Sequence, residues 1–239
     1  MHLTLAMHIP DGFLSGQVAA ATAVMATLVV AVALRIADRS IDEHQAPLLG
    51  VLAAFVFAVQ MLNFPVVGGT SGHFLGAALA AVLLGPWLAC LVMTVVVTTQ
   101  ALAFADGGIG ALGANVLNMG VLGALLGGLI VAGAVKVVRP NHTLYLAVVG
   151  VGAWVAVMAG AAATSIELAL SGTIPLGTVL PPMLGVHAFI GIGEAFITIV
   201  AVSGVLAARP DLVAIGCGRP LPVVLAPPRR HPGVAEEAS

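Results

Sequence analysis

The chain has 239 residues, of which 60% are hydrophobic and 8% are charged, and its formal net charge is −2. Soluble domains are roughly 45–50% apolar and about 25% charged, so this composition cannot cover a water-facing surface and excludes a soluble globular protein. The eight Lys and Arg residues are scattered along the chain, which argues against a nucleic-acid partner. The expected solvent is therefore a lipid bilayer.

The apolar runs predict an all-α fold, a polytopic membrane bundle of about seven transmembrane helices, with about six as the nearest alternative. The predicted segments form one metal-binding transmembrane domain over residues 1–209. They lie at 17–36, 47–62, 73–85, 86–104, 110–136, 143–170 and 187–208. The Pro-rich stretch 210–239 is predicted to be a disordered tail.

The positions of the cations predict the orientation, because Lys and Arg next to short loops stay in the cytoplasm. All of them follow the first, fifth or seventh predicted helix: Arg35, Arg39, Lys136, Arg139, Arg209, Arg219, Arg229 and Arg230. The tail is then cytoplasmic, and the N-terminus lies outside the cell membrane. The connections 63–72, 105–109 and 171–186 also lie outside, and none of them carries Lys or Arg.

Three polar segments on the predicted outer side each contribute one histidine, namely His8, His73 and His187. The topology was assigned from apolar runs and cations alone, so this placement was not built into it. Chance would also place three histidines on one side in a fair share of cases. The arrangement supports a metal site without establishing one.

The segment 63–73 breaks the helical pattern with Pro65 and several glycines, and Asn63 and Ser71 add polar side chains to it. Non-helical backbone at membrane depth must be buried in protein or line a cavity, so a pocket is expected here. A neutral His73 imidazole at this point could bind nickel, cobalt, zinc or copper. The alternative is a histidine that only hydrogen-bonds a loop carbonyl.

His8 offers more nitrogen donors if the mature chain begins at Met7. A histidine in second position provides the terminal amine, its own deprotonated amide and its imidazole, and His73 would add a fourth nitrogen. Such a square-planar set favours nickel(II) or copper(II), with cobalt accepted after adjustment. Six residues precede Met7 in the sequence as written, so either translation starts at Met7 or this ligand set is altered.

Glu194 lies inside the last predicted helix. An ionisable group in a membrane span normally faces the bundle interior and finds a partner there. Two roles carry equal weight for Glu194: a structural interhelical hydrogen bond, and the orientation of a ligand histidine.

Three motifs resemble the CbiM/NikM family: 7–14 (MHIPDGFL), 63–76 (NFPVVGGTSGHFLG) and 187–198 (HAFIGIGEAFIT). These proteins are the substrate-binding membrane subunits of energy-coupling-factor (ECF) transporters for cobalt and nickel, a type of ABC transporter. The resemblance implies that Co²⁺ or Ni²⁺ is the transported substrate and that Met7, His8 and His73 hold it, with His187, Glu194, Asn63 and Ser71 as additional candidates. Sequence alone leaves cobalt and nickel undecided.

The same resemblance implies the partners. No Walker motif is present in the chain, so the energy must come from elsewhere. The family supplies a transmembrane coupling subunit, cytoplasmic ATPase subunits and a small auxiliary membrane subunit. No organic cofactor is expected.

We expect that the chain is not an enzyme. Two functions other than that of a transporter subunit remain open. A membrane-embedded zinc-dependent hydrolase would use Glu194 as a base and the three histidines as ligands. It is disfavoured because the chain lacks a His-Glu-x-x-His helix. A self-sufficient channel or carrier is disfavoured because the spans contain little charge.

Overall fold

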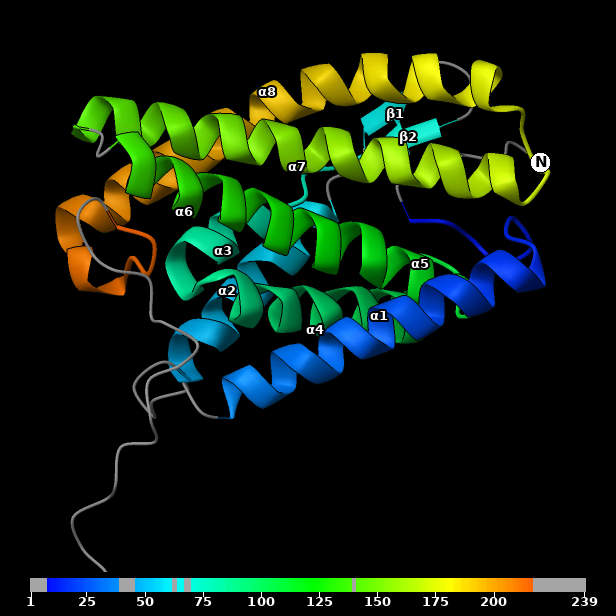
Figure 1. Ribbon diagram of the computed structural model, residues 1–239, viewed down its shortest axis with the longest axis horizontal. Helices are drawn as coiled ribbons and strands as arrows, with labels where there is room; N and C mark the ends of the chain where they lie inside the picture. Colours follow the sequence, from blue (N-terminus) through cyan, green and yellow to red (C-terminus); the bar gives the residue numbers. More distant parts are fainter. Residues whose placement is uncertain (1–7, 39–45, 62–63, 67–69, 139–140, 217–239) are drawn as a thin grey trace, which may run out of the picture.

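The computed structural model describes residues 8–38, 46–61, 64–66, 70–138 and 141–216, and Figure 1 shows a bundle of helices. The elements in chain order are α1 (Gly16–Ala37), α2 (Ala46–Gln60), β1 (Phe64–Val66), β2 (Thr70–Gly72), α3 (Ala77–Leu84), α4 (Pro86–Phe104), α5 (Leu112–Asn115), the π-helix η2 (Val116–Leu126), α6 (Gly127–Val138), α7 (His142–Leu170), α8 (Leu176–Ala208) and the short 3-10 helix η3 (Pro210–Leu212).

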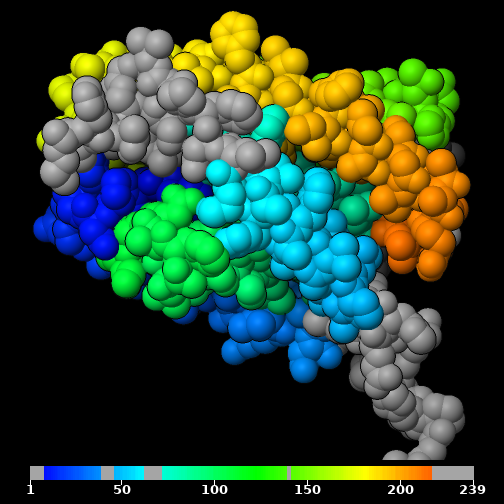
Figure 2. All heavy atoms as spheres, turned by 180° about the vertical axis from the view of Figure 1, so that it is seen from behind, coloured from blue at the N-terminus to red at the C-terminus, as the bar shows by residue number. Residues whose placement is uncertain are grey.

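Two long antiparallel helices form one side of the bundle. α7 and α8 make the most extensive helix pair, and α1 crosses the bundle on the side away from α8 (Figure 1). α2 lies at the surface of the opposite face (Figure 2), where Phe57 stacks at 4.9 Å against Phe104 at the end of α4. The short helix α3 lies inside the bundle with all eight residues buried.

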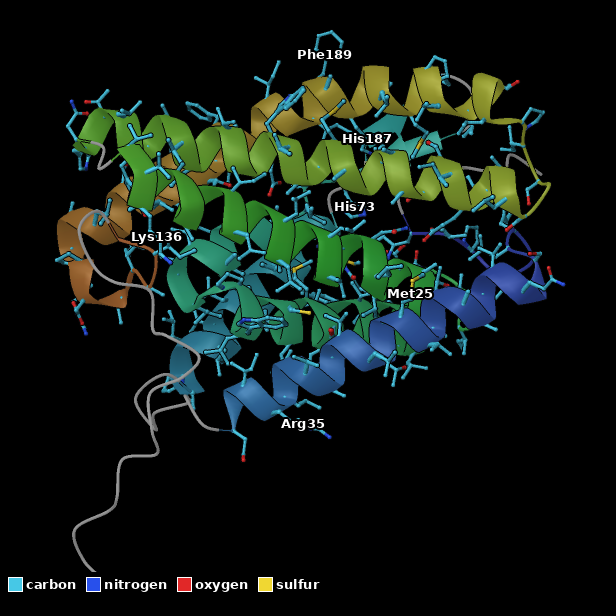
Figure 3. The ribbon with its side chains drawn as sticks, viewed as in Figure 1. Met25, Arg35, His73, Lys136, His187 and Phe189 are labelled. Atoms are coloured by element: carbon cyan, nitrogen blue, oxygen red, sulfur yellow. The ribbon has the colours of Figure 1, made fainter. Side chains whose placement is uncertain are left out.

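The exterior of the bundle is apolar, as a lipid environment requires. Large hydrophobic side chains are exposed on α1, α4, α7 and α8, among them Leu28, Val95, Val151 and Phe189. Figure 3 shows Phe189 pointing away from the bundle. In the described residues, five helices are long and apolar enough to cross a membrane: Gly16–Ala37, Pro86–Phe104, Leu112–Val138, His142–Leu170 and Leu176–Ala208. The chain is a multi-pass membrane protein, and the predicted all-α membrane fold is confirmed.

The predicted number of about seven spans and the outside N-terminus stay predictions. The segments expected at 47–62 and 73–85 correspond to helices of 15 and 8 residues, which are shorter than the five long helices. Residues 64–72, expected as irregular loop, contain a two-stranded antiparallel hairpin that pairs Phe64 with Gly72.

The last long helix begins at Leu176, earlier than the predicted start at 187. The connection predicted over 171–186 contains Pro181 and Pro182, and proline normally ends or kinks a helix. Both prolines lie inside α8. Membrane helices tolerate proline because neighbouring groups satisfy the freed carbonyls. His187 therefore lies within α8 and does not open it.

The chain after α8 folds back onto α3. The amides of Ala214 and Ile215 donate to the carbonyls of Leu83 and Val82 at 3.3 and 3.0 Å, and the Tyr145 hydroxyl donates to the Ile215 carbonyl at 2.6 Å. The segment 210–216, predicted as the start of the disordered tail, is therefore packed against the bundle. The rest of that prediction lies outside the described residues.

Candidate metal site

The segment that carries His8 is held in place through its backbone. The Ile9 amide donates to Asn115 Oδ1 at 2.7 Å, and Asn115 Nδ2 donates back to the Ile9 carbonyl at 3.1 Å. The Gly108 amide donates to the same carbonyl at 2.9 Å. One amide side chain at the end of α5 thus satisfies both backbone groups of Ile9 and fixes the position of His8.

The next residues of this segment are attached to two connections between helices. Asp11 accepts hydrogen bonds from the amides of Ile109 and Gly110 at 3.2 and 2.7 Å. The Thr173 hydroxyl donates to the Phe13 carbonyl. Residues 8–14 and the connections around 105–111 and 171–175 therefore meet at one end of the bundle.

His73 lies between β2 and α3, in a stretch fixed by two buried side chains. Glu194 on α8 accepts the amide protons of Leu75 and Gly76 at 2.9 and 2.7 Å. Gln60 Nε2, at the end of α2, donates to the Leu75 carbonyl at 2.6 Å. Gly76 takes a left-handed conformation with φ of 71°, which lets the chain turn into α3.

The two segments bring His8 and His73 together. Their ring centroids are 4.6 Å apart with planes inclined by 40°, and the residues are 2% and 0% exposed. Burial lowers the pKa of His8 to about 4 and that of His73 to about 3, and the His8 charge contributes to the lowering at His73. Both imidazoles are therefore neutral at physiological pH, which is the form that binds metal.

Several ring nitrogens are buried without a partner. Both nitrogens of His8 and Nε2 of His73 and His187 have no hydrogen-bond partner among the described residues. His73 Nδ1 donates to the Phe74 carbonyl and His187 Nδ1 to the Met183 carbonyl, each at 2.7 Å. Because a carbonyl can only accept, the proton lies on Nδ1 in both residues, and Nε2 carries a free lone pair.

The hydrogen bond from Nδ1 to a backbone carbonyl is the usual second contact of a metal-binding histidine. Figure 3 shows His73 and His187 at the same level along the bundle. The described residues contain no group of three or more His, Cys, Asp and Glu side chains placed to hold one ion together. A complete ligand set would therefore need donors other than these side chains.

The structure describes some of the predicted site residues and not others. The structure brings His8 and His73 together, and it places Glu194 on the backbone that follows His73. Met7 and Asn63 lie outside the described residues. Ser71 is in β2, but its side chain also lies outside the described part. These assignments to metal binding stay predictions.

Sequence reasoning missed Asp106, which is half-buried and close enough to His73 for their charges to interact. Burial raises the pKa of Asp106, and the His73 charge opposes this rise. The available signal was an acidic residue in a predicted outer connection without Lys or Arg. Asn115 and Gln60 were also missed as supports of the two histidine segments.

A family model described as the cobalt uptake substrate-specific transmembrane region, CbiM, matches residues 8–212. The chain belongs to the CbiM family. A putative metal transport protein of Haloquadratum walsbyi is 43% identical over 209 residues, covering 87% of this chain and 93% of that protein. A putative fused nickel transport protein, NikMN, of Archaeoglobus fulgidus is 39% identical over 209 residues, covering 87% of this chain and 68% of that protein.

Solved structures agree with the family assignment. A crystal structure of a transition metal transporter matches with a TM-score of 0.77 and 34% identity, covering 84% of this chain and 92% of that chain. A truncated transition metal transporter matches with a TM-score of 0.75 at the same identity, covering 84% and 98%. The CbiM-family chain is thus a transport protein of the cell membrane and not an enzyme, and the hydrolase alternative is dropped.

Proposed function

We propose that this chain is the substrate-binding subunit of an ECF-type transporter that takes up cobalt or nickel ions. The observation that carries the proposal is the pair of buried imidazoles of His8 and His73, with unpartnered nitrogens and ring centroids 4.6 Å apart. Imidazole nitrogen suits both metals. Relatives named as nickel transport proteins and as cobalt transport proteins support this substrate class.

In the proposed ligand set, the main chain supplies the nitrogens that side chains do not. The Met7 amine, the His8 amide and the His8 imidazole form one chelating unit, and His73 Nε2 adds a donor from the other segment. Asn115 holds Ile9, the residue next to this unit, by two hydrogen bonds. The Met7 nitrogen is a free terminal amine, the donor that this ligand set requires, only when Met7 is the first residue.

The interior of the bundle favours a carrier that needs a partner over an open channel. α3 follows the His73 segment directly, and all of its residues are buried and apolar. Beyond Glu194, Thr198 is the only buried polar residue of α8. Because α3 and the part of α8 that follows Glu194 offer an ion few polar groups, we propose that a coupling subunit and cytoplasmic ATPase subunits reorient the loaded chain.

Calorimetric titration with Ni²⁺ and Co²⁺ tests the metal site. Protein that begins at Met7 should bind one ion per chain, and His8→Ala and His73→Ala should each abolish binding. His142, exposed at the start of α7, provides the control His142→Ala, which should bind as the parent does. Unchanged affinity in the His8 and His73 variants would refute the site.

Uptake in cells tests the partners. Accumulation of labelled Ni²⁺ or Co²⁺ should require both this chain and its ATPase subunits. Uptake at full rate by the chain alone would show a self-sufficient channel or carrier and overturn the coupled mechanism.

A further inference from the structure

His187 is a buried imidazole that the proposed ligand set does not use. It is 0% exposed in the middle of α8, and its Nδ1–H donates to the Met183 carbonyl one turn earlier in the same helix. This bond fixes the tautomer, so Nε2 holds a lone pair that can accept a proton donor or bind a metal. No donor faces it among the described residues.

The Nε2 atom faces the segment that carries His73. A Cβ atom added to Gly72 would lie 3.4 Å from His187 Nε2 and would overlap Ile190 Cδ1. Glycine therefore lets the end of β2 approach α8 without a shift of the Ile190 side chain, which an alanine at this position would require. His187 and His73 are also near enough for their charges to interact.

The helix that carries His187 is firmly packed at this level. Trp154 Nε1 on α7 donates to the Ala188 carbonyl at 3.1 Å, and the same indole lies against Gly191. His8, in contrast, lies in a segment without regular secondary structure that is attached by hydrogen bonds. Of the two imidazoles near His73, His187 is thus the one held by a helix.

His187 does not complete the resting site. His8, His73 and His187 are not placed to hold one ion at the same time. A buried polar atom without a hydrogen-bond partner is uncommon in folded proteins, so Nε2 calls for a partner at some stage of the working cycle. A metal ion that shifts by a short distance from the His8 side would meet that need.

We propose that His187 Nε2 is an exchange ligand, a second metal-binding position that holds the ion together with His73 while the ion enters or leaves the His8 nitrogens. The inference rests on the proposed function. In the exchange step the bond from the metal to the His8 imidazole breaks and a bond to His187 Nε2 forms. Each imidazole binds through a nitrogen without a proton, so the swap transfers neither a proton nor an electron.

The role predicts a kinetic effect that differs from that of the resting ligands. An incoming donor speeds the release of a tightly held ion, because a new bond to the metal forms while the old bond breaks. Removing His187 should therefore slow exchange and leave equilibrium affinity nearly unchanged. Removing His73 should abolish binding.

The test uses the chain starting at Met7, loaded with radioactive Ni²⁺ and chased with excess unlabelled Ni²⁺. His187→Gln removes the imidazole, and His187→Phe keeps a planar aromatic ring, larger than imidazole and without nitrogen, so that packing and ligation are separated. Both variants should exchange about tenfold more slowly than the parent, with dissociation constants within about threefold of it. Thermal unfolding in detergent confirms that the variants are folded, and Thr198→Val serves as the control further along the same face of α8.

Parent-like exchange in either folded variant would overturn the proposal. Loss of tight binding in both variants would also overturn it, because His187 would then belong to the resting site. Failure of the proposed function would appear separately, as retained Ni²⁺ binding in His73→Ala.

Discussion

Glu194 and Gly76 lie 118 positions apart in the sequence and are joined by a hydrogen bond of 2.7 Å from the Gly76 amide to the Glu194 carboxylate. The second carboxylate oxygen accepts the Leu75 amide at 2.9 Å. These two amides precede α3 and would otherwise be buried without acceptors. The carboxylate therefore fixes the backbone that follows His73. Which of the two roles considered from the sequence Glu194 plays stays a prediction.

Glu194→Gln should weaken metal binding. A glutamine keeps one acceptor oxygen but presents an NH₂ group to the other backbone amide, so one buried amide loses its partner at a cost of about 1–3 kcal/mol. We expect a rise in the dissociation constant for Ni²⁺ of about 10–100-fold, the usual effect of losing a group that orients a ligand. Titration calorimetry measures it.

Glu167→Gln is the matched control for this change. Glu167 is also a buried carboxylate in a long helix, but it accepts from Asn118 Nδ2 at 2.7 Å and does not contact the His73 segment. Its substitution should leave Ni²⁺ affinity within about threefold of the parent. Equal losses in both variants would show that Glu194 acts through general stability alone.

Asn115→Leu should weaken metal binding from the opposite side of the site. Leucine has the same number and branching of side-chain heavy atoms but leaves both the amide and the carbonyl of Ile9 without the Asn115 side chain. The His8 segment should then detach more often, and Ni²⁺ affinity should fall at least about tenfold. Asn141→Ala removes the N-cap of α7 and should cost about 1 kcal/mol of stability without changing affinity.

Sequence alone predicted the membrane class and the meeting of His8 with His73, for different reasons. The assignment to membrane proteins follows from composition, because a chain with so few charged residues cannot cover a water-facing surface. The prediction that His8 and His73 lie close together followed from placing both segments on one side of the bilayer. This placement limits the possible distance between the two residues but does not fix it. The resemblance of the motifs around both histidines supported the same conclusion.

The supports of the site could not be predicted in this way. Asn115 and Glu194 bind backbone groups more than 100 positions away, and Gln60 binds one 15 positions away, and such pairs leave no periodic pattern. Polar residues inside apolar helices also serve as helix-to-helix contacts, so their residue type does not reveal their partner. The start of α8 was placed too late: the helix continues through Pro181 and Pro182, which membrane helices tolerate because neighbouring groups satisfy the freed carbonyls.

Gly108→Ala should disrupt the site sterically. A Cβ atom at Gly108 would overlap the Asp11 amide and would lie 2.7 Å from the Pro10 carbonyl carbon. Because these are backbone atoms, the clash cannot be relieved by a side-chain rotation, and the His8 segment must move. Ni²⁺ binding should fall at least about tenfold, as expected when a ligand segment loses its support.

The control for this steric effect is Gly133→Ala in α6, where an added Cβ meets nothing within 4 Å. It should bind Ni²⁺ as the parent does and gain up to about 1 kcal/mol of stability, because alanine favours a helix over glycine. Unchanged affinity in Gly108→Ala would mean that the contact of residues 8–11 with the 107–110 connection does not position the metal ligands.

Asp106→Asn should slow the capture of metal without changing the ligands themselves. Asp106 is half-buried beside His73, its backbone is fixed by an amide hydrogen bond of 3.0 Å to the Gln100 carbonyl, and its side chain forms no salt bridge among the described residues. A carboxylate at the mouth of a buried site attracts a divalent cation and raises its association rate. Stopped-flow measurements should show an association rate about three- to tenfold lower in the variant, with a weaker dependence on ionic strength because the screened charge is gone.

Asp211→Asn, which removes a carboxylate paired with Arg209 elsewhere on the surface, should leave the rate unchanged. An unchanged dissociation rate in Asp106→Asn would assign the carboxylate to capture, whereas a faster one would make Asp106 a ligand of the bound ion.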